Sequence, residues 1–240
     1  MTELLYQTDS YIREFPARIE KIDLDQQAII LDRTAFYPGG GGQPADSGSI
    51  DLPGASLPIK RARKSGSDIL HIIEGEYELP EIDQPVTGVL DWDLRYRLMR
   101  THTAMHILCG VIFRDYGASV TGGSMEPLAG RMDFEFETMH KELVHEIEAA
   151  INQEVENARP VRVDILPREK AFQIPDLIRT KINLLPEGIQ EVRVVEIEGL
   201  DLQADGGTHV HNTSEVGQIE IVDYKSKGKI NKRIYVRLVE

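Results

Sequence analysis

The 240-residue sequence predicts an α+β fold with two domains. Residues 1–90 contain short β-branched segments between Gly and Pro turns, residues from Trp92 show helical spacing, and alternating strands return after Pro160. We expect a small β-barrel in residues 1–90, because closure hides strand edges. Residues 91–240 should form a second domain, an antiparallel sheet packed with helices.

The first domain should be built from strands bounded by turn-forming residues. "QQAIILD" (26–32) and "DILHIIEG" (68–75) are short and β-branched, and "SGSIDLPGASLPIK" (47–60) has the spacing of a hairpin. "QPVTGVLDW" (84–92) alternates apolar residues on one face. No long helix is expected before residue 91.

Two helices are predicted in the second domain. The first runs from Trp92 to about Tyr116, and the second lies in "MHKELVHEIEAAINQEVENARP" (139–160). The apolar stripe of the second helix is Leu143, Ile147, Ile151 and Val155; its histidines, His140 and His145, should be surface residues. Strands are expected at 161–166, 191–197, 217–224 and 233–239, and a short helix, interrupted near Pro175, at 168–178.

The net charge of −13 argues against a protein that coats nucleic acid non-specifically, but it is compatible with a local basic patch. Basic residues cluster at Lys60–Lys64, Arg95–Arg100 and Lys225–Arg233, and for any one cluster solvated surface charge is the alternative. No apolar run approaches the ~20 residues of a membrane helix, and the N-terminus does not resemble a signal peptide. With a single cysteine, these features predict a cytoplasmic protein without a membrane partner.

Two segments predict a metal site. His102 and His106 are spaced i, i+4 on one helix face, and Asp205 and His209 flank two glycines that permit a tight turn. Together they offer three or four nitrogen and oxygen ligands, which suits zinc with an open position. His211 competes with His209 for the role. Cys109 lies ~10 Å along the helix from His102, so we expect it to be a small buried side chain.

Four segments, in order, resemble the editing domain of alanyl-tRNA synthetase and its freestanding AlaX relatives, in their medium-sized form. They are "TAFYPGGGGQPADSG" (34–48), "HTAMH" (102–106), "GGSMEPLAGRMDFEF" (122–136) and "GGTHV" (206–210). The family pattern CxxxH has Asp205 in place of cysteine here. Asp205 can bind zinc directly, bind it through water, or only orient His209.

The resemblance implies an ATP-independent hydrolase that removes serine or glycine from tRNA specific for alanine, with Zn²⁺ as cofactor. It assigns substrate discrimination to Thr34 and Gln43, and support of a ligand histidine to Asp133, for which a structural hydrogen bond is the alternative. The candidate tRNA contacts are Arg95, Arg97, Arg100, Lys227, Lys229, Lys232 and Arg233. A non-catalytic tRNA-binding module with a structural metal is the alternative function, and a metallohydrolase acting on another ester is a third.

Overall fold

A computed structural model describes residues 2–178 and 188–240. Contacts between residues divide the chain into two compact units, Met1–Arg97 and Leu98–Glu240. The division predicted from the sequence falls slightly earlier, at the start of helix α1 (Trp92–Tyr116), which begins in the first unit and ends in the second.

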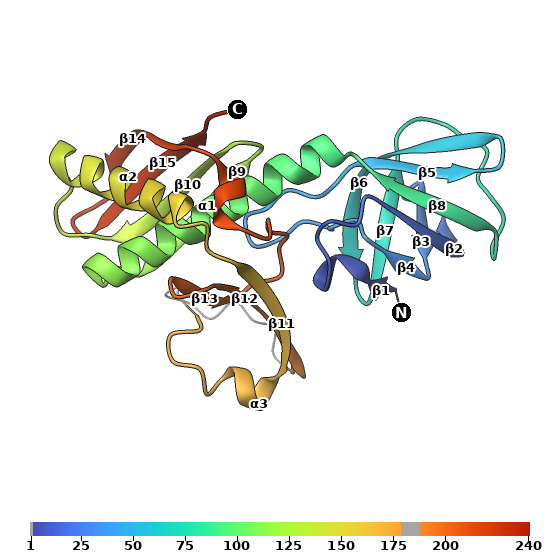
Figure 1. Ribbon diagram of the computed structural model, residues 1–240. Coiled ribbons are helices and arrows are strands. Elements are labelled where there is room, and N and C mark those ends of the chain that lie inside the picture. The colour runs from blue at the N-terminus through green and yellow to red at the C-terminus, as the bar shows by residue number, and fades with distance from the viewer. Residues whose placement is uncertain (1, 179–187) are drawn as a thin grey trace. The chain divides into compact units, whose positions relative to one another are not determined.

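The first unit contains the closed β-barrel that the sequence predicts (Figure 1). Its strands, in order around the barrel, are β2 (Glu14–Asp23), β3 (Ala28–Leu31), β7 (Asp68–Ile73), β6 (Ala55–Ser65), β5 (Gly48–Leu52) and β8 (Pro85–Leu90). All neighbours pair antiparallel, so the barrel has no open edge. A short parallel pair, β1 (Glu3–Leu4) and β4 (Arg33–Thr34), and a 3₁₀ turn, η1 (Leu5–Gln7), complete the unit.

The barrel interior is filled by aliphatic and aromatic side chains, with Phe15 and Phe36 in edge-to-face contact. Gly88 of β8 lies against Phe15, and a Cβ at this glycine would come within 2.3 Å of the ring. The predicted hairpin at 47–60 is β5 and β6, and the predicted segments 26–32 and 68–75 contain β3 and β7.

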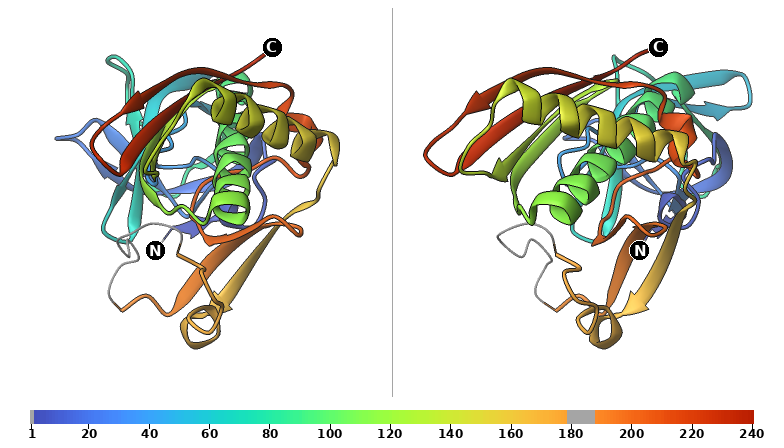
Figure 2. Two further views of the ribbon diagram at one scale, coloured as in Figure 1. Left: turned by 90° about the vertical axis from the view of Figure 1, so that its left-hand side faces the viewer. Right: turned by 60° about the vertical axis from the view of Figure 1, so that its left-hand side comes forward.

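The second unit contains two antiparallel sheets rather than the single sheet expected. One has the strand order β14 (Ile219–Ser226), β15 (Asn231–Leu238), β10 (Ala129–Glu135), β9 (Val120–Glu126), and the other β11 (Val161–Pro167), β12 (Glu191–Ile197), β13 (Asp201–Ala204). Helix α2 (Lys141–Glu156) lies along β14 and the 3₁₀ turn η2 (Thr213–Val216), as Figure 2 shows.

Three local details differ from the sequence expectations. The helix expected at 168–178 is the single turn α3 (Arg168–Ala171), and its end precedes Pro175. Helix α2 buries Val144 rather than Leu143, while His140 caps the helix by accepting a hydrogen bond from the Leu143 amide. The β9–β10 hairpin lacks a strong apolar alternation, so the sequence pattern did not reveal it. Within the described residues, no helix is long and apolar enough to cross a membrane.

Candidate metal centre

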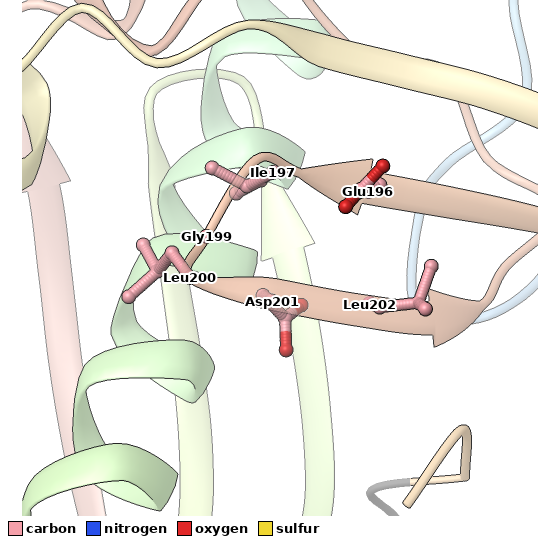
Figure 3. Close-up of a pocket in the computed structure, with 6 residues that line it drawn as sticks. All are labelled: Glu196, Ile197, Gly199, Leu200, Asp201 and Leu202. Carbon is pink, nitrogen blue, oxygen red and sulfur yellow. The ribbon is translucent and has the colours of Figure 1, made fainter. Parts of the chain in front are cut away.

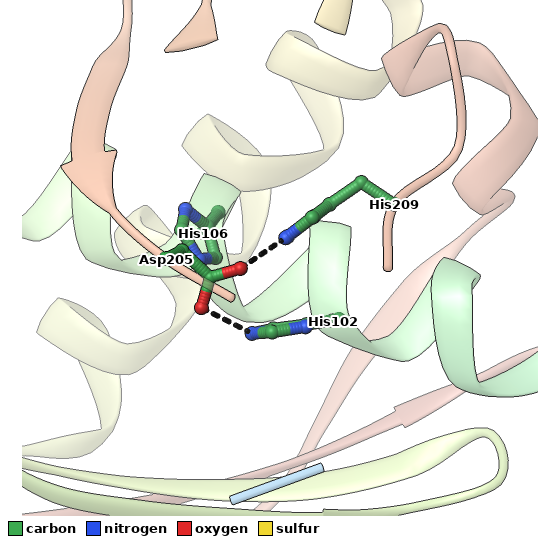
Figure 4. Close-up of side chains that lie close together, drawn as sticks. All are labelled: His102, His106, Asp205 and His209. Atoms are coloured by element: carbon green, nitrogen blue, oxygen red, sulfur yellow. Dashed lines mark hydrogen bonds and ion pairs between the residues drawn. The ribbon is translucent and has the colours of Figure 1, made fainter. Parts of the chain in front are cut away.

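The second unit brings the four predicted ligand residues into one buried cluster. One nitrogen or oxygen atom from each of His102, His106, Asp205 and His209 can be chosen so that all four atoms lie within 4.8 Å of one another (Figure 4). The two helical histidines come from successive turns of α1, and the other two residues come from the loop that follows β13. The pattern in the sequence therefore identified residues that the fold places together.

The carboxylate of Asp205 lies between two imidazoles. Its Oδ2 is 3.0 Å from Nε2 of His209, and its Oδ1 is 3.5 Å from Nε2 of His102. Two ligand atoms on one tetrahedral zinc ion, with bonds of 2.0–2.1 Å, lie about 3.3 Å apart. The separations in the cluster thus suit ligand atoms that share an ion.

The turn that carries Asp205 and His209 differs in detail from the one expected. Neither Gly206 nor Gly207 has a positive φ angle. The turn is closed by Asp205 itself, whose Oδ2 accepts a hydrogen bond of 2.7 Å from the Gly207 amide. His209 and Val210 are held against α1 through Thr103: its hydroxyl oxygen is 3.2 Å from Nδ1 of His209 and accepts a hydrogen bond from the Val210 amide.

Burial sets the protonation of the cluster. It lowers the pKa of His209 to about 4, although the hydrogen bond that His209 donates to Asp205 opposes this shift, and it lowers the pKa of His102 well below 6.5. Burial alone would raise the pKa of Asp205, but the surrounding histidines hold this pKa well below its usual value. Neutral imidazole and ionised carboxylate are the forms that bind a metal ion.

A second carboxylate, Asp201 of β13, supports His106. Its Oδ2 accepts a hydrogen bond of 3.0 Å from Nδ1 of His106, and this assigns Nε2 as the ligand atom. The same oxygen accepts from the Gln203 side chain at 2.7 Å, and Gln203 also contacts the sulfur of Cys109 at 3.3 Å. Cys109 is thus the small buried side chain that was expected, and it is not among the ligand atoms.

Burial would lower the pKa of His106, but the hydrogen bond and charge of Asp201 raise it above its ordinary value. Asp201 is buried next to the turn of the β12–β13 hairpin, where residues 196, 197 and 199–202 line a pocket (Figure 3). Sequence reasoning missed Asp201 and Gln203. Their alternation along β13, which leads directly into Asp205, was the signal that could have revealed them.

Arg193 of β12 is another residue that the sequence did not reveal. Its side chain is buried, and Nη1 donates a hydrogen bond of 2.9 Å to the backbone oxygen of Asp205. The same nitrogen lies 3.7 Å from Oδ2 of Asp205. Arg193 therefore fixes the start of the ligand turn and keeps a positive charge beside its carboxylate.

Asp133 lies on β10 and does not support a ligand histidine. It forms a paired ion contact with Arg233 of β15, at 2.6 and 2.8 Å. Hydrogen bonding to the Arg233 guanidinium is the main cause that lowers the pKa of the Asp133 carboxyl group. The structural hydrogen bond left open as the alternative for Asp133 is the one observed.

Most of the predicted tRNA contacts are occupied by interactions within the chain. Arg95 is fully buried in the first unit, where it pairs with Asp46 and donates to the backbone oxygens of Ser10 and Ala35, so it is removed from any surface that could hold tRNA phosphates. Arg97 pairs with Asp93 at 3.2 Å on the surface of α1.

In the second unit, Arg100 donates to the backbone oxygens of Val216 and Val239, and Lys232 donates to those of Gly228 and Lys229. Lys227 and Lys229 are exposed in the β14–β15 hairpin.

Thr34 and Gln43 lie in the first unit and are both buried. The glycine run before Gln43 is an ordered turn: Gly39, Gly40, Gly41 and Gly42 all have positive φ angles, and Gly40 and Gln43 exchange two backbone hydrogen bonds. Thr34 accepts a hydrogen bond from the Phe36 amide, and its oxygen is 2.8 Å from Nε2 of His71.

Sequence comparisons cover the whole chain. The family described as "Threonyl and Alanyl tRNA synthetase second additional domain" matches residues 192–235, which include Asp205 and His209, and "tRNA synthetases class II (A)" matches residues 8–94. An alanyl-tRNA editing protein AlaX-M of Methanosarcina barkeri is 39% identical over the full length of both chains.

A second AlaX-M protein, from Saccharolobus solfataricus, is 40% identical over 98% of both chains. An alanine–tRNA ligase of Ignicoccus hospitalis is 37% identical over 92% of this chain but only 24% of its own length, so the similarity is to one part of that enzyme. These full-length matches show that this chain belongs to the AlaX-M family of alanyl-tRNA editing proteins.

Proposed function

We propose that the chain hydrolyses the ester bond of serine or glycine attached to tRNA specific for alanine, with zinc held by the buried cluster. The observation that supports this most directly is the convergence of three histidines and one carboxylate in the second unit. Full-length similarity to alanyl-tRNA editing proteins supports the substrate class. Such a reaction belongs to the cytoplasm, where aminoacyl-tRNA is used.

The residues would divide the work as follows. His102, His106 and His209 would hold the ion, with Asp201 and Thr103 fixing the orientation of two of these rings. When bound, zinc supplies a Lewis acid that can lower the pKa of a water molecule, polarise an ester carbonyl or bind the substrate's amino group. Asp205 would act as a direct ligand, held in place by Arg193.

Selection of serine over alanine requires recognition of one hydroxyl group. The hydrogen-bond pattern around Thr34 supports its proposed role, with Gln43, in that recognition. Nδ1 of His71 lies 3.1 Å from the backbone oxygen of Ile29 and so carries the proton, which makes Nε2 the acceptor of the Thr34 hydroxyl proton. The Thr34 oxygen also accepts from the Phe36 amide, so it has one lone pair left and can only accept from a further partner, which suits a serine hydroxyl that donates.

A deacylation assay tests the proposal. Purified protein is offered Ser-, Gly- and Ala-esters on tRNA specific for alanine, with and without a chelator. We expect hydrolysis of the serine or glycine ester, sparing of the alanine ester, and loss of activity on chelation. Equal hydrolysis of the alanine ester would refute editing.

Matched variants show whether the cluster is responsible. His209→Gln should lose both metal and activity, whereas His145→Gln, an exposed change on α2, should lose neither. Thr34→Val should lower the ratio of kcat/KM for serine over alanine by about tenfold, the value of one hydrogen bond. An unchanged ratio would remove Thr34 from the discrimination.

One observation favours a second candidate function. With Asp205 included, four protein ligand atoms are available, and a closed set of four is typical of structural zinc sites. A tRNA-binding module with a structural metal would bind tRNA and one equivalent of zinc but hydrolyse none of the three esters. Chelation would then lower its thermal stability without any effect on deacylation.

A further inference from the structure

We propose that β6 is a phosphate-binding strand, on which Lys60, Arg61, Arg63 and Lys64 bind the backbone of the tRNA substrate. This inference rests on the proposed function for the identity of the RNA. It concerns the first unit alone and a basic cluster that the candidate tRNA contacts above do not include.

The four cations are exposed, and they are available for a partner. Among the residues that the structure describes, none of the four lies within 4.0 Å of a carboxylate. The Arg63 guanidinium donates a hydrogen bond to the side-chain oxygen of Gln26, which is a neutral partner. Asp68, at the neighbouring end of β7, is instead paired with Lys21 of β2 at 2.7 Å.

The other two basic clusters contrast with this one. Arg95 is buried against Asp46, Arg233 is paired with Asp133, and Lys225 is 3.0 Å from Asp223. A cation that already has a carboxylate partner gains less from a phosphate, since the phosphate must displace that partner. The strand β6 therefore carries the densest group of uncommitted positive charge that the described residues contain.

The local geometry explains why adjacent residues are exposed together. The β6–β7 ladder shifts register between Ile59 and Arg61, so Lys60 is an extra residue in a β-bulge. Beyond the bulge, Ala62 faces the barrel interior opposite His71, while Arg61 and Arg63 face outward opposite Ile72 and Leu70.

The outward face gives the two arginines a fixed base. Leu70 and Ile72 form a small apolar cluster with Ala28 and Ile30. Ile72 is the cross-strand partner of Arg61 and Leu70 that of Arg63, so the aliphatic stems of the two arginines lie beside this cluster. The α-carbons of Arg61 and Arg63 are about 6.6 Å apart along a strand, which is close to the separation of successive phosphates in a nucleic-acid strand. Planar guanidinium groups at this spacing suit bidentate contacts to phosphate oxygens.

The charge of the whole chain adds to the argument. With a net charge of −13, the protein repels RNA at long range, so binding of a tRNA requires a local surface of opposite sign. Four cations within five residues of β6 provide that charge, with Arg61 and Arg63 on the outward face and Lys64, exposed at the strand end, on the side of Ala62.

Binding to uncharged tRNA tests the inference without using the reaction. Fluorescence anisotropy with a labelled transcript of tRNA specific for alanine, measured over a series of salt concentrations, gives both affinity and salt slope. Two double variants, Lys60→Gln/Lys64→Gln and Arg61→Gln/Arg63→Gln, should each weaken binding about tenfold or more at low salt and reduce the slope by about one per lost contact. The control variant Arg162→Gln/Arg237→Gln removes two exposed cations that are paired with Glu198 and Glu220, and it should bind as wild type does.

The outcomes separate the two proposals. Wild-type affinity and slope in both β6 variants would overturn the phosphate-binding strand, as would an equal loss in the control. A protein that binds phosphatidylserine vesicles through the β6 cations but does not bind tRNA would also overturn it. A wild-type protein that binds tRNA through β6 yet hydrolyses no ester would leave the strand in place and refute the proposed function instead.

Discussion

Acidification should destabilise the barrel through a single histidine, His71. This side chain is fully buried in β7, with Nδ1 bound to the Ile29 carbonyl and Nε2 to the Thr34 hydroxyl. Burial lowers the pKa of His71 from 6.5 to about 4. The folded barrel therefore contains the His71 ring in its neutral form.

The sign and size of the effect follow from that pKa. Above pH 6.5 the ring is neutral in both folded and unfolded chains, so the barrel keeps its full stability. Between pH 6.5 and 4 only the unfolded chain binds the proton, and stability is lost as the pH falls. The difference in pKa corresponds to about 3 kcal/mol in total, of which about 2.5 kcal/mol is lost at pH 4.5.

Urea denaturation at pH 7 and pH 4.5 measures this loss. The chain has one tryptophan, Trp92, which lies in the first unit, so its fluorescence reports on that unit. His71→Gln can keep both hydrogen bonds without titrating, and it should reduce the loss between the two pH values by about 2–3 kcal/mol relative to wild type. An equal loss in wild type and variant would refute the assignment of the pH dependence to His71.

The remaining predictions concern the metal centre and two close contacts. Asp201→Asn should weaken zinc binding about 10–100-fold without unfolding the chain, as measured by competition with a chromophoric chelator; wild-type affinity would contradict its role behind His106. Asp205→Cys should raise the preference for zinc over manganese in the same competition, since thiolate is the softer ligand, and an unchanged preference would argue that this position does not touch the ion. Arg95→Met should cost about 3–5 kcal/mol in urea denaturation, because it leaves the Asp46 carboxylate buried without a cation; a loss below 1 kcal/mol would contradict this. Gly110→Ala places a Cβ 2.8 Å from Leu200 and 3.1 Å from the Asp201 side chain, so it should reduce zinc affinity as well as thermal stability, and a change in stability alone would show that the hairpin moves without disturbing the ligands.

The parts of the fold that depend on local pattern were predictable from the sequence. The barrel, α1 and α2 follow from alternation, helical spacing and turn residues, which neighbouring side chains determine. The split of the second unit into two sheets was not predictable, because it depends on which distant strands pair. The pairing of β10 with β15, for example, joins segments about a hundred residues apart.

The same distinction applies to the site. His102, His106, Asp205 and His209 were recognisable because their spacing is local within each segment. The environment of a charged side chain is not local, and for this reason Arg95 looked like a surface cation in the sequence. Its partner, Asp46, lies 49 residues earlier, and only the folded barrel shows that the pair is buried.

The family pattern that this chain resembles has a cysteine where this chain has Asp205, and this difference has a consequence for oxidation. A thiolate ligand is converted by peroxide to sulfenic acid and higher oxides, and it then releases its metal ion. Imidazole and carboxylate groups do not undergo this chemistry, and the chain's one sulfhydryl, Cys109, is buried outside the ligand cluster. We therefore expect this centre to keep its ion under oxidative stress that would empty a centre with a thiolate ligand.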